Sequence, residues 1–173
     1  MLEDQTVLFA DGTATYSSMT GYEDNTSIPV TTVASLSAID PDDLLDMQQD
    51  AFEDVDGNGE YYMHRNVYFA LKKLKDLQDR YIFEIEGNSI TLGGAKVNIW
   101  NRMHDGSNTG DMVVLYGDTR RAGKIGVGRD MSIDVDTSVD FTKGGLCWRL
   151  MCDFGFVVPL PGAVSKLRIV STT

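Results

Sequence analysis

The sequence contains few of the residues that catalytic and metal sites most often use. Its 173 residues include only two histidines and two cysteines. His64 and His104 do not have the HxxxH or HExxH spacing of zinc enzymes, and neither cysteine belongs to a CxxC pair. The chain also has no GxSxG nucleophile motif and no GxxxxGK[ST] phosphate loop. We therefore predict that the protein is not an enzyme and has no catalytic, cofactor or metal site.

Basic residues and long apolar runs are also scarce. The 26 acidic residues outnumber the 15 basic ones, and the formal net charge is −11. Such a charge disfavours contact with phosphate backbones, so we expect no specific recognition of a nucleic-acid sequence. No apolar run approaches the roughly 18 residues of a membrane span, and the acidic start at Met1 to Asp4 is unlike a signal peptide. We expect neither a membrane nor a small-molecule substrate as partner.

Residues 54–65, DVDGNGEYYMHR, resemble the calcium loop of an EF-hand. The residues that match positions 1, 3, 5 and 6 of that loop are Asp54, Asp56, Asn58 and Gly59. Position 12 needs a carboxylate, but Arg65 occupies it, and position 9 is Tyr62. We interpret the stretch as a turn, because Asp, Asn and Gly tolerate turn conformations. A calcium-binding module using Asp54 to Asn58 remains an alternative function.

Two amphipathic helices are predicted in the first half of the chain. Asp40 suits an N-cap and Pro41 suits the first helical position, which predicts a helix over residues 40–53. Its apolar face consists of Leu44, Met47 and Ala51. After Asn66, apolar residues three and four apart predict a second helix: Val67, Ala70, Leu71, Leu74 and Leu77. The first 35 residues are rich in turn formers and are predicted to be extended chain.

Strands dominate from residue 80 onward. The predicted strands are 81–85, 96–100, 112–116, 131–136 and 146–156. The continuous apolar run at 112–116 is typical of a strand covered on both faces. The last two strands alternate, so we expect one apolar face of each to be buried: Met131, Ile133 and Val135, and then Leu146, Trp148, Leu150, Cys152, Phe154 and Phe156. Cys147 and Cys152 are expected to be reduced, and the overall pattern predicts an α+β fold.

Six sequence segments, in order, resemble the major capsid proteins of tailed bacteriophages, whose fold is named after phage Hong Kong 97. They are LFADGTATYSSMTG at 8–21, the acidic-start helix at 40–53, YYMHRNVYFALKKLKD at 61–76, LGGAKVNI at 92–99, VLYGDTRRAGKIGVGRDMSIDVD at 114–136 and FTKGGLCWRLMCDFGFVVPLPGAVSKL at 141–167. The resemblance extends over almost the whole chain. It departs from the family at Lys96, where the family has proline.

The resemblance implies an axial lobe formed mostly by residues 27–127 and 159–173. Residues 1–26 and 128–158 would then be the remnant of a peripheral lobe. Family members carry, before the first of these segments, an N-terminal arm, an extended hairpin and a spine helix along the peripheral lobe. We therefore expect a truncated capsid subunit or prophage remnant. The Lys–Asn crosslink of some members is not expected, because no asparagine follows Asn108.

The function that this resemblance implies is structural: self-association of copies into a virion shell, after synthesis in the bacterial cytoplasm. Subunit contacts are predicted at the end of the buried strand 112–116 and in the polar segment after it: Tyr116, Asp118, Arg120 and Arg121. Without a spine helix, we expect weak assembly and a mostly monomeric or small-oligomer state. An encapsulin-type shell of a bacterial compartment, which shares the fold, is the alternative within the same class.

Overall fold

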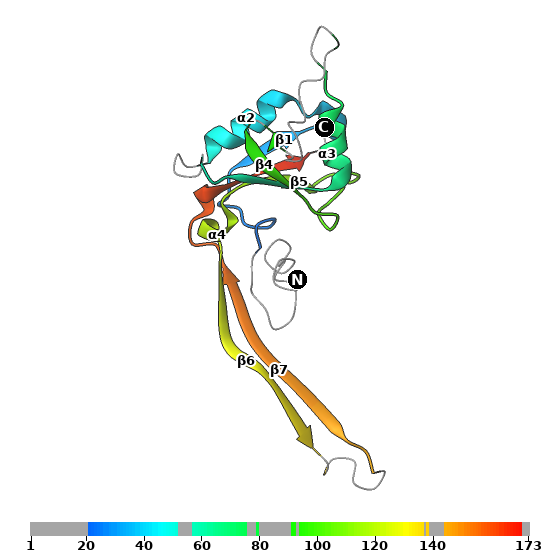
Figure 1. The fold of residues 1–173 in the computed structure, drawn as a ribbon, viewed down its shortest axis with the longest axis vertical. Helices are drawn as coiled ribbons and strands as arrows, with labels where there is room; N and C mark the ends of the chain where they lie inside the picture. The colour runs from blue at the N-terminus through cyan, green and yellow to red at the C-terminus, as the bar shows by residue number, and fades with distance from the viewer. Residues whose placement is uncertain are drawn as a thin grey trace.

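A six-stranded sheet forms the body of the protein, and a long two-stranded ribbon projects from it (Figure 1). The computed structural model describes residues 21–51, 57–75, 79, 91–92, 94–136, 138 and 144–170. The predicted strand at 81–85 and the first 20 residues lie outside this part. The structure contains both helices and strands, and its longest strands pair in antiparallel fashion. This confirms the predicted α+β class.

The body sheet has the strand order β1-β8-β5-β2-β4-β3. Its strands are β1 (Val30–Val33), β2 (Glu60–Met63), β3 (Thr91–Leu92), β4 (Ala95–Ile99), β5 (Met112–Gly117) and β8 (Val164–Ile169). The central strand β5 is antiparallel to β8 and β2, whereas β1–β8 and β2–β4 are parallel pairs. Every residue of β5 is buried, as the continuous apolar run at 112–116 predicts.

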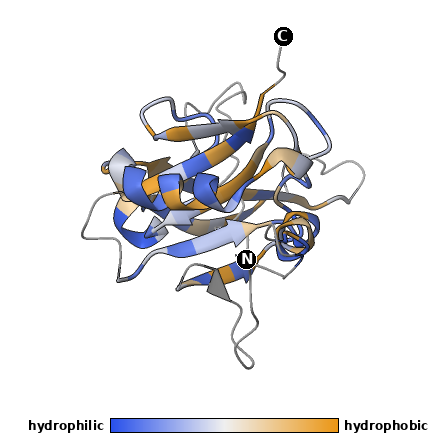
Figure 2. Ribbon diagram, turned by 90° about the horizontal axis from the view of Figure 1, so that it is seen from above, coloured by the Kyte–Doolittle hydropathy of each residue, from blue (hydrophilic) through white to orange (hydrophobic). Residues whose placement is uncertain are grey.

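Two helices pack against this sheet at its centre and edge. Helix α2 (Pro41–Asp50) begins where predicted, and the Asp43 carboxylate accepts a hydrogen bond of 2.8 Å from the Asp40 backbone N–H. Helix α3 (Arg65–Lys72) begins close to the predicted position but ends earlier, because the Lys73 N–H bonds back to the Ala70 carbonyl at 3.1 Å. Leu74 is therefore not helical, and Leu77 lies outside the described residues. In Figure 2 both helices carry orange and blue bands, as amphipathic helices do.

Hydrogen bonds tie α2 to the sheet through the core. The Tyr61 hydroxyl donates to the Leu44 carbonyl at 3.1 Å, and the Ser165 hydroxyl donates to the Met47 carbonyl at 2.7 Å. Among the described residues, the body also contains three short helical segments: η1 (Leu36–Ala38), α4 (Thr119–Ala122) and η4 (Pro161–Ala163). No helix within the described part of the chain has the length and apolar character needed to cross a membrane.

The ribbon consists of the antiparallel strands β6 (Lys124–Asp136) and β7 (Cys147–Val157). The register shifts twice, once on each side of Arg129, and the ribbon curves along its length as it leaves the body (Figure 1). One face carries cross-strand ion pairs, Asp134 with Arg149 at 2.9 Å and Arg129 with Asp153 at 3.4 Å. The other face carries the alternating apolar residues.

This apolar face corrects one expectation from the sequence. Its side chains are exposed, with Trp148 at 68% and Leu150 at 60% of their accessible surface. The same holds for Met131, Ile133, Val135, Leu146, Cys152 and Phe154, and only Phe156, at the base, is buried. The alternation correctly indicates strands and one apolar face. The alternation does not show whether a second layer covers that face, and none of the described residues forms such a layer.

Candidate subunit-contact site

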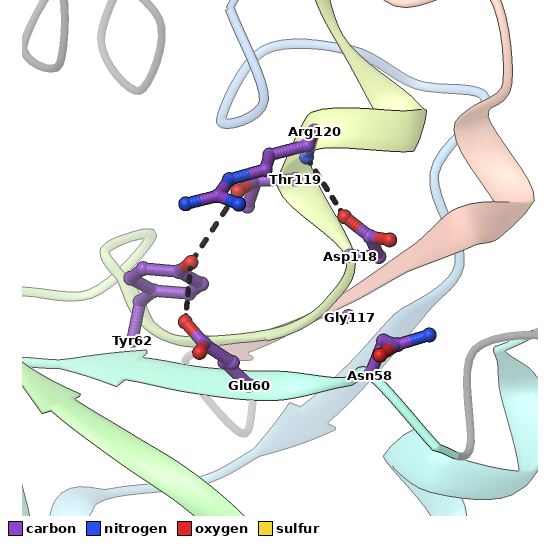
Figure 3. Close-up of a pocket in the computed structure, with 7 residues that line it drawn as sticks. All are labelled: Asn58, Glu60, Tyr62, Gly117, Asp118, Thr119 and Arg120. Carbon is purple, nitrogen blue, oxygen red and sulfur yellow. Dashed lines mark hydrogen bonds between the residues drawn. The ribbon is translucent and has the colours of Figure 1, made fainter.

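A polar cleft of about 190 Å³ lies where β5 ends and α4 begins (Figure 3). Its floor comes from the start of β2 and its wall from the turn that leads into α4. The residues that line it are Asn58, Glu60, Tyr62, Gly117, Asp118, Thr119 and Arg120. Because β2 and β5 are hydrogen-bonded neighbours, with Glu60 opposite Gly117, the sheet itself brings these two segments together.

Glu60 has a side chain that is bonded to three other side chains. Its carboxylate accepts hydrogen bonds from Asn98 at 2.6 Å, from the Tyr62 hydroxyl at 3.0 Å and from Lys96 at 3.4 Å. Burial alone would raise the pKa of Glu60, but these bonds and the charge of Lys96 outweigh it and hold the pKa below its ordinary value. The cleft therefore contains a fixed carboxylate that is negatively charged at neutral pH.

Asp118 shapes the other side of the cleft. Its carboxylate caps α4 by accepting hydrogen bonds from the backbone N–H groups of Arg120 at 3.0 Å and Arg121 at 3.3 Å. The Asp118 N–H donates in turn to the Ala163 carbonyl at 3.1 Å. The turn is thus fixed on both sides, and the two arginines are exposed at its tip.

Two of the four residues predicted from the sequence, Asp118 and Arg120, line this cleft. Arg121 follows them in α4 and is exposed. Tyr116 is only 2% exposed, and its ring lies 4.6 Å from that of Tyr61 in the core. Its side chain therefore supports the strand from inside and does not reach the surface.

The sequence reasoning missed Glu60, Tyr62 and Asn98. Glu60 and Tyr62 are two residues apart in one strand, so a period-two reading of residues 60–63 would have placed them on one face. Asn98 could not have been found in this way. It reaches Glu60 because β4 pairs in parallel with β2, which is a contact between distant segments.

Replacement of Glu60 by glutamine tests this charge network. We expect the free energy of unfolding to fall by about 0.5–1 kcal/mol near neutral pH, since the side chain is partly exposed. The folded-state pKa is depressed, so the contribution of Glu60 is present above its ordinary pKa of 4.5 and is lost as the pH falls through the lower folded-state value. Urea unfolding of both proteins across this range should show the difference vanishing in acid. Asp46→Asn, at an exposed position of α2, is the control and should show a smaller change.

The calcium-loop alternative depends partly on residues 52–56, which lie outside the described residues. Within the described part, Gly57 and Asn58 form a turn, and Tyr62 belongs to β2. Arg65, at the position that needs a carboxylate, is the first residue of α3 and lies over the Phe69 ring at 5.6 Å. Among the described residues, no three His, Cys, Asp or Glu side chains converge as metal ligands would.

The fold is similar to that of solved shell proteins. A capsid chain of the empty GTA particle superposes with a TM-score of 0.74 and 18% identity, covering 98% of this chain and 60% of that one. A chain of Gordonia phage Cozz gives 0.63 and 15%, covering 98% and 59%. The holo-SrpI encapsulin of Synechococcus elongatus gives 0.60 and 13%, covering 98% and 60%. The chain thus spans about 60% of the length of these structures.

These similarities show that the fold is of the Hong Kong 97 type. The model of the phage capsid family matches residues 1–169, and the protein belongs to that family. Comparison with curated proteins returns no match. Members of the family are structural proteins that assemble as many copies in the shell of a virion, in agreement with the expectation that this chain is not an enzyme.

Proposed function

We propose that the protein is a major capsid subunit of a phage or prophage, which acts by self-association. The observation that carries the proposal is the family match over residues 1–169, in agreement with the capsid fold. The protein would be made in the bacterial cytoplasm and function in the virion. Its net charge of −11 disfavours contact with phosphate backbones and supports the further proposal that the protein recognises no specific nucleic-acid sequence. Copies of itself are its proposed partners, with neither a membrane nor a small-molecule substrate.

The division into two lobes is part of this proposal. Residues 27–127 and 159–173 would form the axial lobe, and residues 1–26 and 128–158 the remnant of a peripheral lobe. The ribbon supports the assignment of residues 128–158, because it has its own strand pairing and leaves the body after Gly123. Residues 22–25 do not fit it, because their carbonyls accept hydrogen bonds from β8 of the body sheet. The uncovered apolar face of the ribbon is where additional chain, such as the spine helix of family members, would pack.

Contacts within rings of subunits are proposed at the tip of the cleft. Asp118, Arg120 and Arg121 lie on a turn whose backbone is held by the cap of α4, so the points from which these side chains project are fixed. A ring requires two different, complementary surfaces on each subunit, because each copy contacts its neighbours head to tail. Exposed charges at such a contact set register and partner choice more than affinity. Tyr116 would contribute only by supporting this turn from the core.

Reversal of both arginine charges tests the contact. The double variant Arg120→Glu and Arg121→Glu is expected to weaken self-association roughly tenfold, because like charges would then face each other across the ring contact. Sedimentation velocity over a range of protein concentrations gives the association constant. Lys73→Glu with Arg102→Glu changes the net charge equally at exposed positions elsewhere and is the matched control.

Equal association of the two double variants would contradict the proposed contact while leaving the capsid assignment intact. Electron microscopy on the same samples tests the assignment itself, with small ring-like oligomers as the expected result. Regular closed shells formed by this chain alone would contradict the expectation of weak assembly. A protein that stays monomeric at every concentration would contradict self-association.

An encapsulin-type compartment shell is the second candidate, and the similarity to the SrpI encapsulin favours it. The GTA capsid chain superposes more closely, which favours the phage assignment. Neighbouring genes separate the two. A gene for a cargo enzyme beside this one would support an encapsulin, whereas genes for a terminase, portal and protease would support a phage.

A further inference from the structure

Residues 22–25, the anchor segment, are held on the body sheet by a buried lysine. Lys166 is only 2% exposed, and its ammonium donates hydrogen bonds to three carbonyls of this segment. The acceptors are the carbonyls of Glu23 at 2.7 Å, Asn25 at 2.8 Å and Tyr22 at 3.3 Å. An ammonium has three donors, so each of them has a partner here.

Further charged groups secure the same segment. Arg168, two residues along β8, donates to the Glu23 carbonyl at 2.7 Å. The Glu23 carboxylate lies 3.1 Å from Nε2 of His104, whose Nδ1 is 3.5 Å from Asp111. Burial and the nearby Arg168 lower the pKa of Lys166 to about 8, while Asp24 and Glu23 oppose that shift. The ammonium is therefore the main form at neutral pH, and it can keep all three bonds.

The first residue of the anchor segment reaches the base of the ribbon. Tyr22 is fully buried, and its hydroxyl donates to the Thr119 carbonyl of α4 at 2.8 Å. Its ring meets that of Phe156, near the end of β7, edge to face with 5.4 Å between centroids. Gly123, immediately before β6, has no room for a side chain, because a Cβ there would overlap the Tyr22 hydroxyl and the Phe156 ring. Figure 1 shows the start of this segment, in blue, below the sheet near α4.

Both strands of the ribbon thus leave the body beside Tyr22. The chain connects body and ribbon at two points, at the start of β6 and at the end of β7. These two connections alone would leave the ribbon free to pivot about its base, because the backbone dihedral angles there can change easily. A buried aromatic ring between the two connections prevents the ribbon from pivoting only if the ring itself is held in place. The bonds from Lys166 and Arg168 hold the backbone on which that ring is carried.

We propose that the anchor segment sets the direction of the ribbon relative to the body sheet, with Tyr22 as the wedge at the ribbon base and Lys166 as the positioning residue that holds it. The distinctive consequence is that a change at Lys166, whose ammonium bonds to the anchor segment and not to the ribbon, should alter the ribbon's orientation. This inference concerns the geometry of one subunit and does not rest on the proposed function.

A spin-label distance measurement in the full chain tests the proposal. Cys147→Ser leaves Cys152 as the label on the ribbon, and Gln49→Cys places a second label on the exposed side of α2. Double electron–electron resonance near neutral pH then gives the distribution of distances between ribbon and body. In this background we compare Lys166→Met and Tyr22→Ala with the unchanged chain. Lys96→Met, which removes an exposed lysine elsewhere on the sheet, is the matched control.

We expect Lys166→Met and Tyr22→Ala each to broaden the distance distribution roughly twofold, because release of the anchor permits the ribbon to pivot. Lys96→Met should leave it unchanged. Tyr22→Phe keeps the ring and removes only the hydroxyl bonded to Thr119, so it should broaden the distribution less. This variant is the test to use if Lys166→Met fails to fold. If the distance distribution of Lys166→Met stays as narrow as that of the unchanged chain, the proposal is overturned. If Lys166→Met does not fold, an unchanged distribution in Tyr22→Phe overturns it instead. Equal broadening in Lys96→Met overturns it as well.

Discussion

Replacement of Gly117 by alanine is expected to lower the free energy of unfolding by about 4 kcal/mol, a large part of the roughly 5–15 kcal/mol that is typical of a domain. Gly117 is the last residue of β5 and has a φ of +133°, a conformation that side chains disfavour. A Cβ at this position would also overlap the Ala163 carbonyl oxygen and lie 2.7 Å from the Cα of Val164. These are backbone atoms of the neighbouring segment, so the clash cannot be relieved by a side-chain rotation.

Gly110→Ala separates the two causes of this effect. Gly110 also has a positive φ, +95°, but a Cβ there would meet no atom within 4 Å. We expect a loss of about 1 kcal/mol, the cost of backbone strain alone. Urea unfolding of the two variants measures both values. Equal losses would show that the close approach of β5 to Ala163 does not contribute.

The second large effect is expected from Leu115→Ala, which should cost about 3 kcal/mol. Leu115 is completely buried in the central strand, so its removal leaves a cavity between β5 and its neighbours. Leu150→Ala makes the same chemical change on the ribbon, where the side chain is 60% exposed. For this variant we expect a change within about 0.5 kcal/mol. Thermal or urea unfolding at low protein concentration gives the comparison.

This pair of variants distinguishes the single subunit from the assembled state. In the single chain, the apolar face that contains Leu150 has no layer behind it among the described residues, so truncation removes few contacts. If Leu150→Ala destabilised the dilute protein as much as Leu115→Ala, the face would already be covered in solution. Repeating the measurement at high concentration shows whether covering arises from self-association, because the loss would then grow with concentration.

The elements that the sequence predicted well are those fixed by neighbouring residues. Asp40 and Pro41 mark the start of α2 because capping depends on side chains within one turn of the helix. The apolar run at 112–116 marks β5 because its length and composition suit a strand covered on both faces. The end of α3 was placed too late, since the apolar spacing continues past Lys72 although the helix does not.

The candidate site was predicted in part for the same reason. Asp118, Arg120 and Arg121 follow a strongly predicted strand, so a polar turn at its end was evident from the sequence. Tyr116 was included in the contact segment because it adjoins this turn, although it also ends the strand predicted to be covered on both faces. Its ring packs against that of Tyr61 of β2. The hydrogen bond from Asn98 to Glu60 joins residues 38 positions apart, and only the pairing of β2 with β4 creates it.

The sequence by itself determined the α+β class, the positions of the helix starts and central strand, and the apolar face of the ribbon strands. These follow from composition and periodicity, which are local properties. The tertiary structure alone decided that this face lies outside the body, that Glu60 is held in a polar cleft, and that Lys166 holds residues 22–25. Those features depend on which distant strands and segments pair, and the free energy of such pairing is set by packing across the fold, which no local pattern contains.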